Sequence, residues 1–237
     1  MSAIILNPKK IAQELFLEQL KWTMWVLSFI FVIYFAFLIF SGNSVASFIN
    51  VVHFSNGSTS IFVLVLGILT TSTFFRYYIH SGATRKNFYF GVIIASIMQA
   101  IAITIIILIF GFVTHFILGV PWISDIANVR DSGFPISILT LLQFFIGSVL
   151  VYTIYFLMGW QISLTFYRSG WLYGFLSIAG AIVIAGITGI LWEGTHISFF
   201  PQISNLPVLV SVLFTLLMVG LLFIINYRLI KDVTVKM

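Results

Sequence analysis

The chain has 237 residues, of which 61% are hydrophobic and only 7% are charged, and its net charge is +5. Its mean hydropathy is +1.16. A water-soluble protein of this size needs far more polar surface to cover its core, so the composition predicts an integral membrane protein. Cysteine is absent, which excludes disulfides, thiolate metal sites and a cysteine nucleophile.

The N-terminal segment, residues 7–22, reads NPKKIAQELFLEQLKW and predicts a helix, with Asn7 suited to its N-cap and Pro8 to its first turn. One face of that helix is apolar: Ile11, Ala12, Leu15, Phe16 and Leu20. The opposite face is charged: Lys10, Glu14, Glu18 and Lys21. The pattern predicts that residues 1–21 form an amphipathic helix in the inner membrane interface. The alternative is a short cytosolic helix packed on a partner.

Six apolar runs follow, each about as long as the roughly 20 residues that a helix needs to cross a bilayer. They are expected near 22–40, 60–79, 88–118, 136–160, 171–192 and 207–227. None alternates polar and apolar residues as a membrane β-strand would. The third run exceeds the bilayer thickness, so we expect it to tilt, to break near Gly111 or to continue beyond the membrane. The sequence thus predicts an all-α protein with six transmembrane helices over residues 22–237.

Charge predicts the orientation of these helices. With the N-terminus in the cytoplasm, ten of the eleven Lys and Arg residues fall on cytoplasmic segments, and only Arg130 lies outside. Such a bias predicts that both termini are cytoplasmic in a multi-pass protein of the cell membrane. The topology and the anionic inner leaflet of the bilayer account for the positive net charge without a nucleic-acid partner.

The first cytoplasmic loop, residues 76–91, reads RYYIHSGATRKNFYFG and interleaves basic and aromatic residues. The second, residues 165–174, reads TFYRSGWLYG. Both contain R-x-x-(F/W)-x-(F/Y)-G, beginning at Arg85 in the first loop and at Arg168 in the second. Two explanations stay open: an internal repeat, or the base and interface aromatics that any cytoplasmic loop entering a membrane helix carries. The first loop has room for a turn at Ser81-Gly82 and a short helix after it.

Motifs for enzymatic chemistry are absent from the sequence. It contains no phosphate-binding G-x-x-x-x-G-K-(S/T), no H-E-x-x-H and no G-x-S-x-G, so we expect a chain without catalytic, cofactor-binding or metal-binding residues. The tripeptide Asn56-Gly57-Ser58 matches a glycosylation sequon on an expected outer loop, or matches it by chance. Neutral polar residues inside the spans, among them Thr70, Gln99 and Asn226, are expected to hydrogen-bond between helices.

The fifth span carries small residues at every fourth position: Ser177, Ala181, Ala185 and Gly189. Such a stripe allows the backbones of two helices to approach closely. It predicts a packing face for another span of this chain or for the same span of a second copy.

An interfacial N-terminal helix, six spans, cytoplasmic termini and a basic loop after the second span together resemble the permease subunits of ABC exporters. The class is that of the ABC-2 (type II exporter) permeases, which includes small bacterial drug, lantibiotic and peptide exporters. The most specific local similarity is SGATRKNFYFG, residues 81–91. The short segment Glu193–Leu206 departs from members that have a large outer domain there.

The resemblance implies that the loop after the second span is a coupling helix seated in a groove of a separate ATPase subunit. Its contact residues would be Gly82, Thr84, Arg85, Lys86, Asn87 and Phe88. The N-terminal connecting helix would touch the same subunit, ATP and Mg²⁺ would bind in that partner, and two permeases, identical or paralogous, would pair with two ATPases.

Three functions therefore compete at this point. The first is an exporter permease for a hydrophobic or amphipathic substrate such as a peptide antibiotic, drug or lipid-like molecule. The second is a secondary carrier or channel, which the uniformly apolar spans disfavour. The third is a membrane-embedded regulator or immunity protein without transport activity.

Overall fold

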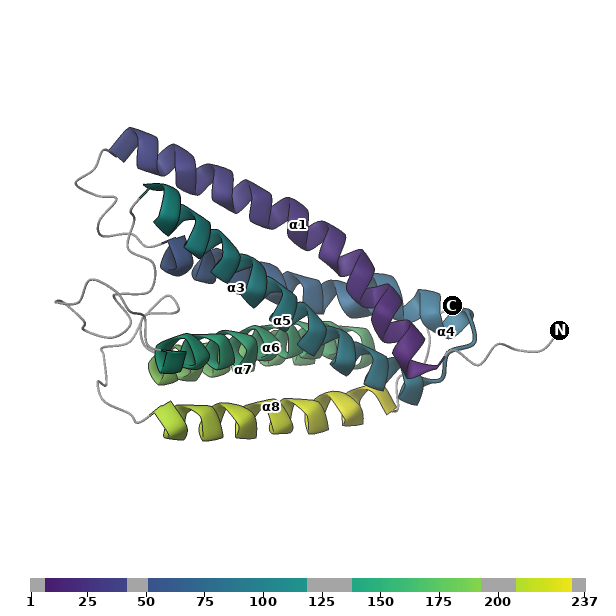
Figure 1. Ribbon diagram of the computed structural model, residues 1–237. Helices are drawn as coiled ribbons and strands as arrows, with labels where there is room; N and C mark the ends of the chain where they lie inside the picture. Colours follow the sequence, from purple (N-terminus) through teal and green to yellow (C-terminus); the bar gives the residue numbers. More distant parts are fainter. Residues whose placement is uncertain (1–6, 42–50, 119–137, 193–207, 232–237) are drawn as a thin grey trace.

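The computed structural model describes residues 7–41, 51–118, 138–192 and 208–231, and within these ranges the chain is helical without strands (Figure 1). The helices are α1 (Pro8–Ser41), α3 (Val51–Leu69), the π-helix η1 (Thr70–Phe75), α4 (Arg76–His80), α5 (Arg85–Leu118), α6 (Ile138–Ser169), α7 (Trp171–Leu191) and α8 (Val208–Lys231). Six stretches of the described chain are long and apolar enough to cross a membrane. The predicted all-α fold with six spans is confirmed.

The ends of the spans differ from the predicted ones in places. Helix α5 runs unbroken through Gly111 to Leu118, which excludes the break and leaves the other two alternatives for this long span, a tilt or a continuation beyond the membrane. Helix α6 continues past Trp160 to Ser169. Residue Asn56 lies within α3 and is 2% exposed, and its side-chain oxygen accepts a 2.5 Å hydrogen bond from the Tyr152 hydroxyl. A buried helical asparagine is not a glycosylation acceptor, so that sequon is a chance match.

The predicted N-terminal helix forms and continues without a break into the first span as the single helix α1. The Asn7 side-chain oxygen accepts a hydrogen bond from the Lys9 amide, as an N-cap does, and Pro8 opens the helix. Of the predicted apolar face, Ile11, Ala12 and Leu15 are buried and Phe16 and Leu20 are half-buried, and α1 packs on α5. At the crossing, a Cβ atom on Gly91 would lie 2.7 Å from the Ile11 Cγ2 atom, so only glycine fits there.

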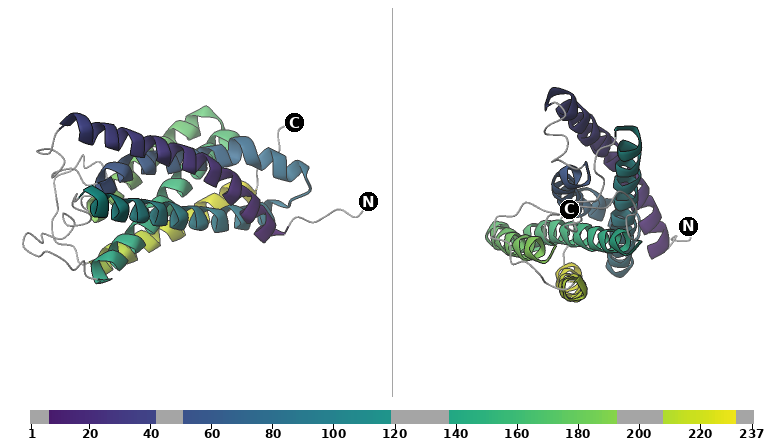
Figure 2. Two further views of the ribbon diagram at one scale, coloured as in Figure 1. Left: turned by 45° about the horizontal axis from the view of Figure 1, so that its top comes forward. Right: turned by 60° about the vertical axis from the view of Figure 1, so that its left-hand side comes forward.

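Helix α6 is the centre of the bundle, because it packs against α3, α5, α7 and α8 (Figures 1 and 2). Its closest neighbour is α3. A Cβ atom on Gly67 of α3 would lie 2.8 Å from the Trp160 amide nitrogen, and one on Gly159 of α6 would lie 2.9 Å from the Leu64 carbonyl carbon. Each glycine therefore receives the backbone of the other helix, as small residues do where membrane helices meet.

The small-residue stripe on α7 behaves differently from this crossing. Ala181 is buried and Ala185 is half-buried against the core, whereas the Ser177 hydroxyl donates to the Gly174 carbonyl of its own helix. Nothing lies within 4 Å of a Cβ atom on Gly189. Within the described chain, the face of α7 that packs is the one against α6, and the backbone-to-backbone approach occurs between α3 and α6 instead.

The π-helix η1 lies in the second span and connects it to α1 through polar side chains. The Gln19 amide of α1 donates a 3.2 Å hydrogen bond to the Thr70 hydroxyl of η1. One turn further along α1, the Thr23 hydroxyl accepts from the Gln99 amide of α5. The Asn226 amide of α8 likewise donates to the Leu157 carbonyl of α6, at 3.2 Å. Three of the expected interhelical hydrogen bonds are thus formed, and they fix the rotation of otherwise apolar helices.

Candidate functional site

One end of the bundle gathers all the Lys and Arg residues of the described chain except Lys21. The start of α1, helix α4 and the end of α8 lie together there (Figure 1). We call it the basic end and define it by eight residues: Lys9, Lys10, Arg76, Arg85, Lys86, Arg168, Arg228 and Lys231. The loop singled out in the sequence, between α4 and α5, is part of this end.

The turn between α4 and α5 is short, and particular residues account for its backbone conformation and its hydrogen bonds. Gly82 has a φ of +89°, a conformation that favours glycine. The Ala83 amide donates to the Tyr78 carbonyl at 2.9 Å and the Gly82 amide to the Ile79 carbonyl at 3.1 Å, which together form the Schellman motif that ends α4. The Thr84 hydroxyl then accepts from the Asn87 amide at 3.1 Å, as the N-cap of α5.

This geometry changes the predicted coupling helix. No separate short helix follows the turn, because Arg85 is the first residue of the 34-residue helix α5. The short helix is α4, which precedes the turn. The predicted contact segment therefore consists of a rigid turn and the first turn of a membrane-spanning helix.

The predicted contact residues divide into an outer and an inner group. Gly82, Thr84, Arg85 and Lys86 are exposed, and Asn87 is half-buried. Phe88 is 0% exposed. Its ring lies 5.3 Å from that of Phe75 and 5.9 Å from that of Tyr78, measured between centroids. The side chain of Phe88 is enclosed by its own chain, so the surface that the turn offers to a partner is that of the outer group.

Phe75, in η1, joins the turn to the centre of the bundle. Its ring packs edge-on against Phe88 of α5 and, at 5.8 Å, against Tyr167 of α6. Both Phe75 and Phe88 are fully buried. The first turn of α5 is thus in direct contact with the second and fourth spans through one aromatic cluster.

The arginines of the two repeated loop motifs converge on the last turn of α8. The Arg85 Nη1 atom donates to the Lys231 carbonyl at 3.0 Å. The Arg168 Nη1 atom donates to the Arg228 carbonyl at 2.9 Å and, more weakly, to the Leu229 carbonyl at 3.4 Å. The last carbonyls of a helix lack partners within it and carry the negative end of its dipole, so cations stabilise them.

The rest of the repeated motif is only partly equivalent. At both motif glycines an added Cβ atom would clash with a neighbouring side chain, that of Ile11 at Gly91 and the Phe166 ring at Gly174. The first aromatic position differs, because Phe88 is buried whereas its counterpart Trp171 is 70% exposed, while Phe90 and Tyr173 at the second are both exposed. The similarity of the loops therefore extends to the arginine, the second aromatic residue and the glycine.

Sequence reasoning missed the carbonyls of α8 and the side chains of Phe75 and Tyr167, which belong to this site. No local signal marks them, since a backbone carbonyl has no sequence signature and aromatics are common throughout the chain. Among the residues that the structure describes, no group of three or more His, Asp or Glu is placed to hold a metal ion.

Comparison with protein-family models, with curated proteins and with solved structures gave no match for this chain.

Proposed function

We propose that this protein is the membrane-spanning permease subunit of an ATP-driven exporter of the ABC-2 class. In this proposal the basic end faces the cytoplasm, and a separate ATPase subunit docks on the exposed surface of Gly82, Thr84, Arg85 and Lys86. ATP and Mg²⁺ bind in the ATPase, and two permeases work together in the cell membrane. The substrate is hydrophobic or amphipathic.

The observation that carries the proposal concerns the turn between α4 and α5, which is exposed on its outer side and packed into the bundle on its inner side. Its outer side offers two cations and exposed backbone at the end of the bundle. Its inner side is anchored by the buried ring of Phe88 against Phe75. A partner that pushes on the outer side would therefore move η1 and α5 with it, because closely packed side chains shift as a unit.

The contacts around the turn support transmission to the remaining helices. Phe75 also touches Tyr167 of α6, and Arg85 holds the end of α8. A displacement of the turn would thus reach three spans besides its own. Such a rigid connection suits a chain that carries no phosphate-binding loop and would receive its driving force from outside.

The test uses Lys86→Glu in the full chain, co-expressed with its neighbouring reading frames, one of which the proposal expects to encode the ATPase. Lys86 is exposed at the start of α5, so the substitution leaves the buried cluster intact. A reversed charge at a docking surface places like charges together and should lower affinity for the ATPase at least tenfold, which corresponds to about 1.4 kcal/mol. Co-purification and substrate-stimulated ATP hydrolysis are the measurements.

The matched control is Arg76→Glu, which reverses an exposed charge at the same end but outside the turn. It should leave co-purification unchanged. If Lys86→Glu inserts normally and retains both co-purification and hydrolysis, the docking surface is wrong. If no ATPase accompanies the wild-type chain and its loss leaves efflux unchanged, a regulator or immunity protein replaces the exporter.

A further inference from the structure

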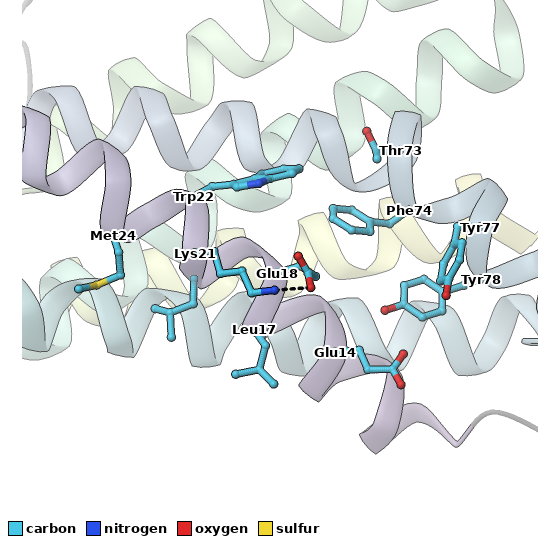
Figure 3. A pocket seen from close by; sticks show the side chains of 11 residues that line it. Glu14, Leu17, Glu18, Lys21, Trp22, Met24, Thr73, Phe74, Tyr77 and Tyr78 are labelled. Atoms are coloured by element: carbon cyan, nitrogen blue, oxygen red, sulfur yellow. Dashed lines mark hydrogen bonds and ion pairs between the residues drawn. The ribbon is translucent and has the colours of Figure 1, made fainter.

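A groove of about 820 Å³ lies between the first half of α1 and the segment formed by η1 and α4 (Figure 3). It is separate from the proposed docking surface. Glu14 and Tyr78 lie at its end nearest the start of α1, and Met24 lies at the other (Figure 3). The groove is open, since Leu17, Met24 and Tyr77 are each at least half exposed.

The charged residues of the groove follow one another in a definite order. Glu14, Glu18 and Lys21 lie along α1 from the bundle end inward. With a rise of 1.5 Å per residue, the backbone of Lys21 lies about 4.5 Å deeper along the helix than that of Glu18, although their charged atoms meet at 2.7 Å. Two acidic residues thus start near the end of the bundle, and one basic residue starts closer to its middle.

A phospholipid with an ammonium headgroup presents the complementary order. Its phosphate is attached to the glycerol and lies closer to the acyl chains, whereas the ammonium lies further out, beyond a short ethylene link. Lys21 would meet the phosphate, and Glu14 and Glu18 would meet the ammonium. Trp22 and Met24, which follow Lys21 along α1, provide apolar surface toward the deeper part of the groove, where the acyl chains begin.

Aromatic residues line both walls of the groove. On the wall opposite α1, the rings of Tyr77 and Tyr78 are 5.2 Å apart and nearly perpendicular; further in, Trp22 of α1 lies 5.9 Å from Phe74 of η1. Aromatic faces attract cations. A primary ammonium carries three donors that match carboxylate oxygens, whereas a choline headgroup carries none, so the two glutamates favour ethanolamine.

We propose that this groove is a binding site for phosphatidylethanolamine from the bilayer, with its ammonium at Glu14 and Glu18 and its phosphate at Lys21. The site does not depend on the export function. The existing 2.7 Å ion pair between Lys21 and Glu18 does not prevent binding, because the two side chains are 68% and 50% exposed. An exposed pair of this kind contributes little to stability, and the headgroup offers each partner an opposite charge in its place.

The test reverses the order of charge without changing its amount. The double substitution Glu18→Lys with Lys21→Glu keeps the net charge and the spacing of the pair while placing the anion at the deeper position. Binding of added phosphatidylethanolamine, phosphatidylcholine and phosphatidylglycerol to the purified full chain is measured by native mass spectrometry. The wild type should bind phosphatidylethanolamine at least tenfold more tightly than phosphatidylglycerol, and the double variant should lose this preference.

A second variant, Glu14→Gln, keeps the interpretation independent of the ion pair. It should weaken phosphatidylethanolamine binding several-fold, whereas Lys9→Gln, an exposed change on α1 outside the groove, should not. Unchanged lipid preference in the charge-reversed double variant overturns the proposal. Equal binding of phosphatidylcholine overturns the role of the glutamates, and competition by soluble glycerophosphoethanolamine at equal concentration overturns the assignment to a bilayer lipid.

Discussion

Replacement of Gly159 by alanine tests the crossing of α3 and α6 most directly. The added Cβ atom would lie 2.9 Å from the Leu64 carbonyl carbon and 3.1 Å from the Ile68 amide nitrogen. Both neighbours are backbone atoms of α3, so no side chain can rotate away. The two helices must separate instead.

The magnitude follows from the geometry. Ordinary contact of a Cβ atom begins at 3.4 Å. The Leu64 carbonyl oxygen would lie closer still to the new Cβ atom, so the helices must separate by more than about 0.5 Å, which forfeits about a quarter to a half of the attraction of each atom pair across the contact. We expect a loss of about 2 kcal/mol in the free energy of unfolding, as for other overpacked interiors.

Reversible unfolding in mixed micelles, followed by circular dichroism, measures this loss. The matched control is Gly180→Ala on α7, where nothing lies within 4 Å of the new Cβ atom, and it should raise stability by about 0.5–1 kcal/mol because alanine is the better helix former. Gly67→Ala should resemble Gly159→Ala. Because one separation relieves both clashes, the double variant should lose about 1 kcal/mol less than the sum of the single losses. Equal stability of Gly159→Ala and Gly180→Ala would refute the close crossing.

Three further predictions concern the basic end. Phe88→Ala should lower stability by about 3 kcal/mol because it empties a buried aromatic site, whereas Lys86→Ala should change it by less than about 0.5 kcal/mol; similar unfolding midpoints for the two would contradict the buried position of Phe88. Arg168→Ala should accelerate hydrogen exchange in the last turn of α8 several-fold, since a cation at a helix C-terminus contributes about 0.5–1 kcal/mol, and Arg76→Ala, an exposed change on α4, should not. Single cysteines at Ser81 and Lys231 should both resist an impermeant reagent in intact cells and react after permeabilisation; labelling of either in intact cells would reverse the predicted orientation.

Local patterns in the sequence determined the spans and the caps. Apolar runs of membrane length predict spanning helices because hydrocarbon cannot satisfy backbone polar groups outside a helix. The turn at Ser81-Gly82 was also readable, since Gly82 supplies the positive φ that ends α4. The apolar face that begins at Ile11 followed from helical spacing alone.

The tertiary structure decided which helices meet and which side chains turn inward. Spans that are apolar on all sides present no distinct face, and lipid is as apolar as a neighbouring helix, so hydropathy cannot select partners. The helices that pack together are those whose surfaces fit closely against each other. Gly67 and Gly159 allow the closest approach, although the stripe on α7 is the more regular pattern.

The same reasoning explains the two revised roles at the candidate site. Phe88 and its counterpart Trp171 occupy equivalent positions in the repeated loop motif, yet one is buried and the other exposed. Only the position of Phe75 against α5 and α6 makes that difference. Arg85 and Arg168 are likewise ordinary loop cations in the sequence, and they become caps because the fold brings the carbonyls of α8, which lack partners within the helix, to both of them.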